Sequence, residues 1–576
     1  MNRHSLLARS LALVAVTALA IADTAAAAAQ ALDAPAATAG TPAAEGDAAP
    51  DAGAPATGPH AHAGIVSGHT RIVPYLELDQ SVYAELTSPN QVLTYTTLAA
   101  GLDASITGRQ TEAAASVRYE HVVGEGHGTG DTDTISGLVR IHHDLVPRTL
   151  ALEAGAMGTR TRVGVTGGTS SDPLVLTGDT TQTWAVYGGP ALTTHLDQIA
   201  VNGSYLVGYT HVGAPGVLAG PGLTRVDPFG HSLAQSGSLS LSTRPGAVAP
   251  VGLGLEVGYD REDISNLDQR VEDFHAMGEV IVPVAYTVEL VGGVGYEHVR
   301  VSSRDVLRDS LGNPVIGSDG RYVTDTALPR HIAFDSSGLI WEAGLLWRPS
   351  RRTSVSAYVG RRYGDVTYWG NATYAPDRRS AFGLAVYQGL SGLGGSLTTT
   401  LSALPTDFTV IRDPLTGAIG SCAVGSTGGG CLDDSLVSVN SSVFRSTGIV
   451  GTYGRKVGRM TMAIGAGYNY RRFIGAPGTI LALGNGTVDR NLYVDAALSS
   501  PVGTRGGFTT SAYANWYWSA QGSLGDTRSY GVRGAYSRTL TDHLLGSIAV
   551  GVEGVEHQAV PNSWVASLLL GLRYTF

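Results

Sequence analysis

Over most of this chain, large apolar side chains alternate with small or polar ones at every second position, and residues 564–576 show this most clearly. One face would carry Trp564, Ala566, Leu568, Leu570, Leu572, Tyr574 and Phe576, and the other Ser567, Gly571, Arg573 and Thr575. A period of two indicates a β-strand, and an apolar face opposite a polar one suits a strand between lipid and a watery lumen. Val565 and Leu569 are exceptions on the polar face. An ordinary strand that happens to end the chain is the alternative.

The same alternation recurs in the interior of the chain, in the segments Met460 to Arg471, Tyr286 to Glu297 and Phe508 to Ser519. In the first of these, the apolar face would carry Met460, Met462, Ile464, Ala466, Tyr468 and Tyr470. Aromatic residues lie near the predicted strand ends, as they do in the girdles of membrane barrels, where an amphipathic ring meets the lipid headgroups. The pattern therefore predicts lipid-facing strands along much of the chain.

Short segments rich in Pro, Gly and Asp separate these strands and are typical of hairpin turns. They are Thr107-Gly108-Arg109, Val146-Pro147-Arg148, Leu196-Asp197-Gln198, Arg244-Pro245-Gly246, Pro283-Val284, Pro349 to Arg352, Pro376-Asp377-Arg378, Arg455 to Gly458, Pro501-Val502-Gly503 and Leu540-Thr541-Asp542. Longer polar stretches around residues 213–230, 304–330 and 404–435 would be extracellular loops. These turns imply about 22 strands, within a range of about 18 to 24, since bacterial barrels have an even count. Ala381 to Leu401 would form one long strand or two short ones.

A soluble sandwich or propeller also alternates, but it needs a second sheet to cover its apolar face. A uniform apolar belt needs only lipid. We therefore predict an all-β fold, a transmembrane antiparallel up-and-down β-barrel over residues 69–576, in the outer membrane of a Gram-negative bacterium. Its partners would be outer-membrane lipid and the barrel-assembly machinery, which would read a C-terminal signal made of Leu570, Leu572, Tyr574 and Phe576.

The start of the chain predicts export. Arg3 and Arg9 precede the apolar run Leu11 to Ala20, and an A-x-A step follows at residues 29–31. Residues 1–31 are therefore predicted to be a signal peptide. Residues 32–68 contain mainly Ala, Pro, Gly, Asp and Thr, which predicts a disordered periplasmic tether. His60 and His62 in this stretch could bind a metal, but solvated spacers are the favoured interpretation.

Charge and cysteine usage narrow the function further. The formal net charge is −10, which argues against a nucleic-acid surface.

Cys422 and Cys431 lie in a Gly-rich stretch, and in an oxidising compartment they are predicted to form a disulfide that closes a loop. A metal site or a catalytic thiol is the weaker alternative, because neither cysteine has a histidine nearby.

The segment from Trp341 reads W-x-x-G-L-x-W-x-P-S-x-R-T-S and continues into G-R-R-Y at residues 360–363. With this motif, the chain resembles the outer-membrane β-barrel proteins associated with exosortase and PEP-CTERM loci. The resemblance extends weakly through residues 443–446 and 468–473 and so covers about half of the barrel. The Ala-rich tether and the cysteine loop are not part of that family's pattern. Because such genes lie among those for exopolysaccharide synthesis and export, the resemblance implies a role in moving polymer across the outer membrane.

Polymer passage requires a lumen lined with polar groups that bind sugar weakly, together with aromatic faces that stack on pyranose rings. The alternation places several such side chains inside the barrel: Ser116, Arg118, Glu120, Arg140, His142, Ser356, Tyr358, Arg362, Asn469, Arg471, Tyr513, Asn515, Ser529, Arg533 and Ser537. Salt-bridged ladders that merely hold the barrel open are the alternative for the charged members. Arg361 faces the other way, toward the headgroups.

An enzyme is the other functional class. Residues 230–234 resemble a nucleophile elbow, but they lack its second glycine and precede a strand instead of a helix. The histidines His142, His143, His231, His298 and His543 show no pairing. We therefore predict no catalytic residue, metal or cofactor.

An export channel working with periplasmic polysaccharide-export proteins is the first hypothesis. A general diffusion porin or nutrient channel is the second, and a structural scaffold is the third. A barrel of this size needs loops or a partner as a plug, and loops such as Asp305 to Ala327 are predicted to fold inward if the protein is not a constant leak.

Overall fold

The computed structural model describes residues 65–67, 70–87, 91–125, 131–162, 180–213, 217–218, 225–226, 229–377, 379–417, 419–425, 428–431, 441–519, 526–558 and 561–576. The predicted signal peptide and nearly all of the predicted tether, with His60 and His62, lie outside these residues. Among the described residues, no helix is long and apolar enough to cross a membrane.

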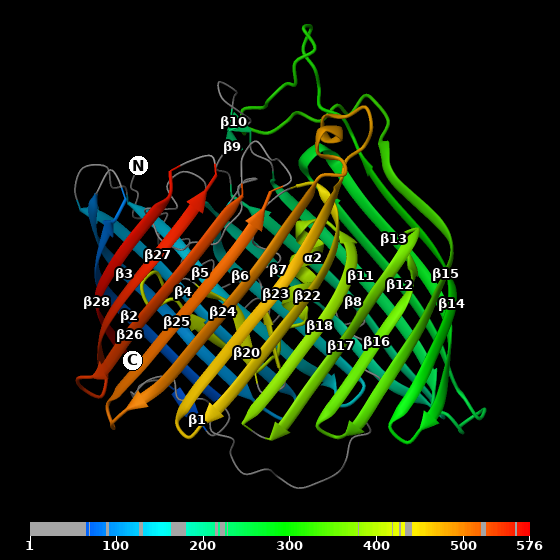
Figure 1. Ribbon diagram of the computed structural model, residues 1–576, viewed down its shortest axis with the longest axis horizontal. Coiled ribbons are helices and arrows are strands. Elements are labelled where there is room, and N and C mark those ends of the chain that lie inside the picture. The colour runs from blue at the N-terminus through cyan, green and yellow to red at the C-terminus, as the bar shows by residue number, and fades with distance from the viewer. Residues whose placement is uncertain are drawn as a thin grey trace.

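Antiparallel strands form a single ring of 22 members (Figure 1). They are β2 (Thr70–Glu85), β3 (Val92–Thr107), β4 (Thr111–Glu125), β5 (Thr132–Val146), β6 (Leu150–Arg162), β7 (Thr180–Leu196), β8 (Ile199–Val212), β11 (His231–Thr243), β12 (Gly252–Ile264), β13 (Gln269–Ala285), β14 (Val288–Ser303), β15 (His331–Ser350), β16 (Thr353–Arg362), β17 (Asp365–Asp377), β18 (Ser380–Ser391), β22 (Val443–Val457), β23 (Met460–Ile474), β24 (Val488–Val502), β25 (Gly506–Trp518), β26 (Thr527–Thr539), β27 (Leu544–His557) and β28 (Ser563–Thr575). The ring closes where β2 pairs with β28, from Tyr75 opposite Thr575 to Glu85 opposite Val565. The predicted fold class and strand number are confirmed.

Several smaller elements do not belong to the 22-strand ring. β1 (Ile65–Ser67) pairs with the start of β2. The strands β9 (Val217–Leu218) and β10 (Arg225–Val226) pair with each other, and η1 (Asn266–Asp268) and η2 (Ile480–Gly484) are 3-10 turns. The helix α2 (Leu393–Ser402) and a small sheet of β19 (Thr409–Arg412), β20 (Ile419–Gly425) and β21 (Gly428–Cys431) lie between β18 and β22 in sequence.

The short turns gather at one end of the barrel, and the long connections gather at the other. The predicted turns match the observed ones, with one error: β13 continues to Ala285 through an irregularity at Pro283, so the turn is at Tyr286 and Thr287. Proline is accepted there because the ladder is already interrupted. Short turns are periplasmic and long loops extracellular in bacterial outer-membrane barrels. The start of β2 and the C-terminus lie at the periplasmic end.

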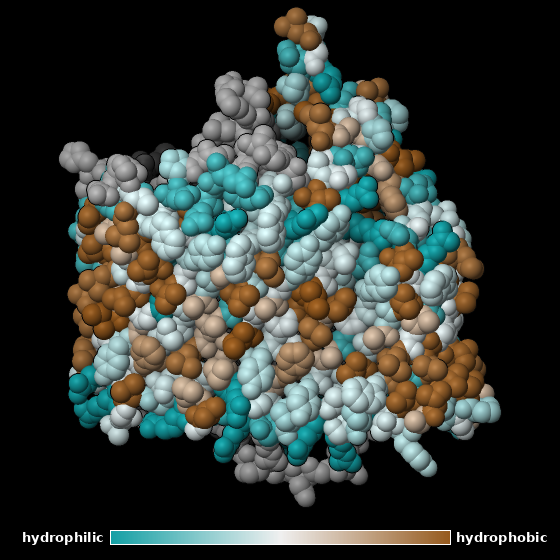
Figure 2. Space-filling view, in the orientation of Figure 1, coloured by the Kyte–Doolittle hydropathy of each residue, from teal (hydrophilic) through white to brown (hydrophobic). Residues whose placement is uncertain are grey.

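Exposed apolar side chains lie on the outer face of strands around the ring and form an apolar belt, part of which is seen between the two rims on the face shown in Figure 2. Leu568, Leu570 and Leu572 of β28 are exposed on its outer face, Leu570 by 54 %, whereas Val565 and Leu569 of the same strand are buried inside. In water such exposure would be costly at about 25 cal/mol per Å², and lipid removes that cost. This belt, the closed ring and the distribution of turns place the protein in the outer membrane.

Two loop predictions and one strand prediction differ from the structure. The loop containing Asp305 to Ala327 is a ribbon that rises above the extracellular rim (Figure 1), with Leu311 84 % exposed, and does not fold inward. The stretch 404–435 belongs to the extracellular connection between β18 and β22, but its described part lies within the barrel instead of outside it. Ala381 to Leu401 is neither one strand nor two, because β18 ends at Ser391 and α2 follows.

Candidate translocation lumen

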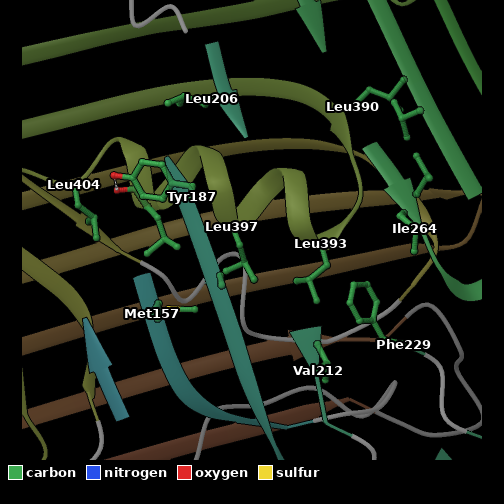
Figure 3. Close-up of a cluster of buried hydrophobic side chains, with 14 of the residues drawn as sticks. Met157, Tyr187, Leu206, Val212, Phe229, Ile264, Leu390, Leu393, Leu397 and Leu404 are labelled. Carbon is green, nitrogen blue, oxygen red and sulfur yellow. Dashed lines mark hydrogen bonds between the residues drawn. The ribbon is translucent and has the colours of Figure 1, made fainter. Parts of the chain in front are cut away.

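An inner segment lies in the connection between β18 and β22, and its described residues are 392–417, 419–425 and 428–431. It enters the lumen from the extracellular end and lines part of the wall. Leu393, Leu397 and Leu401 recur at helical spacing, with Leu404 one turn on, and form a single stripe along α2. All of them are buried in a cluster with inward-facing wall residues that include Met157, Tyr187, Leu206, Phe229 and Ile264 (Figure 3). Burying each of these leucines contributes on the order of 1.5–3 kcal/mol. The helix is therefore firmly packed against β6, β7, β8 and β11.

A carboxylate from the barrel wall caps the start of α2. Glu262 of β12 accepts hydrogen bonds from the backbone N–H groups of Gly392 (2.7 Å) and Gly394 (3.0 Å). The residue preceding the helix, Gly392, offers no side-chain cap of its own. An anion at this position satisfies free N–H groups and interacts favourably with the helix dipole. A side chain at Gly394 would collide with Ser232, so the small residues there permit the close approach.

After α2, the inner segment crosses to another part of the wall near the periplasmic end. Thr406 donates a hydrogen bond to Glu112 (2.8 Å), beside the β3–β4 turn. Arg412 then donates to Ser116 Oγ (3.2 Å) and Ser136 Oγ (2.8 Å) on β4 and β5. Asp413 pairs with Arg533 of β26. These contacts hold the segment to the wall at several heights.

The apolar exceptions of the last strand have partners inside the barrel. Leu569 packs with Leu415 of the inner segment and Ala549 of β27. Val565 packs with Tyr83 and Tyr95. Leu569 therefore marks a place where the inner segment covers the wall, whereas Val565 is covered by the neighbouring wall residues Tyr83 and Tyr95.

Much of the lumen charge is paired within the wall. Arg118 contacts Glu77, Asp79 (3.2 Å) and Glu120 (3.2 Å). Arg140 pairs with Glu153 at 3.0 Å, and His142 lies 3.3 Å from Asp144. Arg533 pairs with Glu553 as well as with Asp413, and Arg471 with Asp489 at 3.7 Å. Such pairs position strands and fix register.

The wall of β12 to β16 is richer in carboxylates. Arg362 pairs with Asp273 at 2.9 Å and with Glu297 at 3.6 Å, and His275 lies 3.9 Å from both Asp273 and Glu256. Glu279 and Glu342 flank Gly293 in register, and the missing side chain at Gly293 leaves space for Glu342. Sequence analysis did not select His275, because no pattern places it opposite its partners.

A row of aromatic and amide side chains crosses the lumen wall from β16 to β25. It consists of Tyr358, Trp369, Tyr387, Asn469, Asn491 and Tyr517, and we call it the aromatic–amide row. Tyr358 is opposite Trp369, Tyr387 opposite Gly448, Gly448 opposite Asn469, Asn469 opposite Asn491, and Asn491 opposite Tyr517. Gly370 of β17 is paired with Val386 of β18, so the residue before Gly370, Trp369, and the residue after Val386, Tyr387, are neighbours across the two strands. Consecutive strands thus bring these side chains together in one continuous line.

Glycines on neighbouring strands let the rings lie flat against the wall. Tyr358 and Trp369 stack with ring centroids 5.5 Å apart and planes 3° apart. The Tyr358 ring covers Gly344, the Trp369 ring covers Gly360 and the Tyr387 ring covers Gly448, so that a side chain at any of these glycines would meet a ring. The part of each ring away from the glycine faces the lumen.

Hydrogen bonds order the amide part of the row. Asn469 Nδ2 donates to Tyr387 Oη (2.7 Å), Asn515 Nδ2 donates to Asn491 Oδ1 (2.8 Å), and Tyr517 Oη donates to Asp489 (2.6 Å). Within the described residues, Asn491 Nδ2 and Asn515 Oδ1 have no hydrogen-bond partner. Asn491 and Asn515 are both buried, so the amide part of the row packs within the wall.

The predicted lumen residues lie on the face opposite the apolar belt, and the row brings some of them together. Tyr358 and Asn469 belong to it, and Asn515 contacts it. Tyr513 lies under the Arg533 guanidinium, 5.3 Å from the ring centre to Cζ. Sequence reasoning missed Trp369, Tyr387, Asn491 and Tyr517 as a group, because their proximity depends on the register between strands.

The cysteine side chains lie outside what the structure describes, whereas their backbone does not. Cys422 and Cys431 are direct partners on β20 and β21. Directly opposed antiparallel positions have the Cα separation that a disulfide requires. The disulfide stays a prediction.

Comparisons with known proteins return no matching family model and no matching curated protein. Solved structures with a similar fold include the FrpB iron transporter from Neisseria meningitidis (13 % identity, TM-score 0.39, 87 % of this chain and 82 % of that one). They also include the open form of the ferric-catecholate import receptor Fiu from E. coli K12 (9 %, 0.42, 87 % and 81 %). The siderophore receptor PiuA from Acinetobacter baumannii is a third (10 %, 0.39, 89 % and 82 %). At these identities we draw nothing about cargo from them.

The ring, the belt and the polar lumen define an outer-membrane β-barrel. No group of three or more His, Cys, Asp or Glu side chains in the described residues could hold a metal ion.

Proposed function

We propose that this barrel is the channel through which an exopolysaccharide crosses the outer membrane. The observation that carries the proposal is the aromatic part of the aromatic–amide row, where Tyr358, Trp369 and Tyr387 lie on the lumen face and are partly exposed. Aromatic faces stack on the apolar faces of pyranose rings. Each contact is weak by itself, which lets a polymer slide.

The geometry of the row suits a chain more than a single sugar. Strands in such barrels tilt by about 35–45° from the axis, so a line that follows the ladder direction runs obliquely along the pore. A polymer lying along this line would contact Tyr358 and Trp369 with one unit and Tyr387 with a later one. The inner segment packs on other strands, β6 to β8 and β11, and so narrows the lumen from a different side.

Sequence supports the same function by association. The Trp341 to Arg352 motif resembles barrels encoded among exopolysaccharide genes. We propose membership of that group together with the function, since the row offers the chemistry that such a role requires. We also propose that the protein performs no catalysis.

A diffusion porin is the second candidate, and the ion-paired wall favours it. Paired charges such as Arg118 with Glu77 and Arg140 with Glu153 suit any water-filled lumen. A porin would show steady conductance that is indifferent to polysaccharide, and its loss would change solute uptake without affecting polymer secretion.

The test is secreted polysaccharide in a clean deletion strain, with periplasmic polymer and membrane integrity measured in parallel. Restoring the intact gene should restore secretion, whereas a gene carrying Tyr358→Ala, Trp369→Ala and Tyr387→Ala should restore it only in part. The matched control is Tyr368→Ala on β17, an outward-facing residue that is 57 % exposed to lipid. Polymer trapped in the periplasm of the deletion strain supports export. Unchanged secretion overturns the proposal and leaves the porin.

A further inference from the structure

Basic side chains gather on neighbouring periplasmic turns along one side of the barrel. The turns β15–β16, β17–β18, β22–β23 and β24–β25 carry a set that we call the basic arc. Its members are Arg351, Arg379, Arg455, Lys456, Arg459 and Arg505, all of them exposed. The chain as a whole carries a net charge of −10, so the arc is a local reversal of sign. It lies on the strands that carry the aromatic–amide row.

The basic arc has little to neutralise it within the described residues. Asp377 is the acidic residue of these turns, and its carboxylate accepts a hydrogen bond from the backbone N–H of Arg379 at 2.7 Å. No member of the arc forms an ion pair with a described residue. Nearby, the Arg352 side chain donates to the Pro376 carbonyl at 2.7 Å instead of to an acid. Exposed guanidinium groups without a partner raise the local potential and attract anionic groups.

We propose that the basic arc is a docking surface for the acidic face of a periplasmic protein, positioned beneath the aromatic–amide row. The proposal rests on the proposed function and names the kind of partner that the channel would have there. Arginine predominates in the arc, and its planar group binds carboxylates in a bidentate manner that lysine cannot reproduce. A surface of this kind sets orientation and association rate.

An anionic lipid headgroup is a less suitable occupant. Lipid surrounds the whole barrel, so lipid binding would place arginines on every periplasmic turn. The turns Asp197–Gln198, Tyr286–Thr287 and the one around Asp542 carry neither Arg nor Lys, and Arg109, Arg148 and Arg244 stand singly on three others. The arc is also not confined to the lipid face, since Arg455 is opposite the outward-facing Met462 whereas Lys456 is opposite Thr461 on the lumen face. The concentration of charge on one side favours a partner that covers one side.

An anionic polysaccharide is also less suitable, because of what lies above the arc. Glu256, Glu279 and Glu342 face the lumen on β12, β13 and β15, next to Tyr358 at the start of the row. A polyanion attracted to the arc would next meet these acidic side chains, which offer it no positive charge. A protein that stops at the entrance avoids them.

Site-specific photo-crosslinking in the full chain, in cells, tests the proposal. A crosslinking amino acid at Thr504, next to Arg505, reports on the arc, and one at Leu311, in the extracellular ribbon, is the negative control. The arc is then neutralised with Arg455→Gln, Arg459→Gln and Arg505→Gln. A charge-retaining set places Lys at the same positions, and a matched set places Gln at Arg109, Arg148 and Arg244 on other turns. Heat-modifiable migration in gels shows that each variant forms a folded barrel.

A discrete adduct is expected at Thr504 that falls at least about tenfold in the Gln set, stays in the matched set and is partly kept by Lys. Its crosslinked peptide should be rich in Asp and Glu. The purified partner should bind the purified chain more weakly as salt rises from about 0.05 to 0.5 M, since screening acts on exposed charges.

The proposal is overturned if the adduct is as abundant in the Gln set as in the unchanged chain, or if no adduct forms at Thr504. Binding of the purified protein to phosphatidylglycerol nanodiscs and, separately, to oligogalacturonate is also measured. Charge-dependent binding to only one of these probes, without a protein adduct, assigns the arc to lipid or polymer and equally overturns it. Polysaccharide secretion by the deletion strain distinguishes a failure of the export function from a failure of the docking surface. If the deletion strain secretes normally, the export function fails whatever the crosslinks show. If the deletion strain does not secrete normally, and the adduct is unchanged in the Gln set, the arc alone fails.

Discussion

Leu415 of the inner segment packs against Leu569 of the last strand, and both are more than nine-tenths buried. Leu569→Ala should lower the free energy of unfolding by about 2–4 kcal/mol, because it removes a buried side chain and leaves a cavity. Unfolding in urea with the barrel in lipid vesicles measures this. A double-mutant cycle with Leu415→Ala should give a non-zero coupling energy. Additive effects would contradict the contact.

Leu397→Asn should release the inner segment from the wall. Leu397 is fully buried in the cluster around α2, and a buried amide without a partner costs about 1–3 kcal/mol beyond the lost apolar contact. We expect faster protease cleavage within residues 392–442 and a larger single-channel conductance in a planar bilayer. Thr399→Asn, at a position exposed on the same helix, is the control. Equal cleavage of the two variants would argue against anchoring by this stripe.

Glu262→Gln should loosen the start of α2 without removing the side chain. The carboxylate accepts hydrogen bonds from two backbone N–H groups, whereas an amide retains the acceptor oxygen and loses the charge. The loss is on the order of 1 kcal/mol, from the dipole interaction. Hydrogen exchange at Gly394 to Leu397 should therefore speed up by about fivefold. Unchanged exchange would mean that the leucine stripe alone holds the helix.

Arg533→Met should destabilise the barrel by about 3–5 kcal/mol, since it leaves buried carboxylates without a partner. Arg533 contacts both Asp413 and Glu553. Adding Asp413→Asn and Glu553→Gln to Arg533→Met should recover part of the loss, because the uncompensated charges disappear. The temperature at which the folded band is lost in gels provides the comparison. No recovery would indicate that packing, not charge, explains the effect.

Trp369→Ala should shorten the dwell time of a neutral oligosaccharide in the pore. The stacked Tyr358–Trp369 pair offers an aromatic platform, and losing about 1 kcal/mol of contact shortens the dwell about fivefold. Current block by a maltooligosaccharide in a planar bilayer measures it. Tyr368→Ala, facing lipid, should leave the dwell unchanged. Equal effects of both changes would contradict a lumen platform.

The ring of strands could be predicted from sequence because each strand carries its own signal. Met460 to Arg471 and Trp564 to Phe576 alternate over their whole length, and the turns carry their own residues. The inner segment could not be predicted, since its leucines at 393, 397 and 401 are separated by Gly and Thr and follow a strand pattern without a break. Leu569 on the lumen face was its only trace in the barrel strands that sequence analysis considered.

The aromatic–amide row lay beyond sequence reasoning for a different physical reason. Tyr358 and Asn469 were recognised as inward-facing, but their relation to Trp369, Tyr387 and Asn491 depends on the register of each intervening pair of strands. A shift of one residue in any pair would move the next side chain to the lipid face. The local alternation determines whether a side chain faces the lumen or the lipid, whereas turns and packing determine which side chains of other strands lie next to it.

The inner segment also bridges the seam at which the barrel closes. Tyr83 of β2 donates a hydrogen bond to the Leu415 carbonyl at 3.5 Å, and the Leu415 side chain packs on β28. The inner segment thus contacts both the first and the last strand of the ring from inside the barrel. Separating these strands would break the contacts of the inner segment as well as the ladder, so the seam is braced against lateral opening into the bilayer.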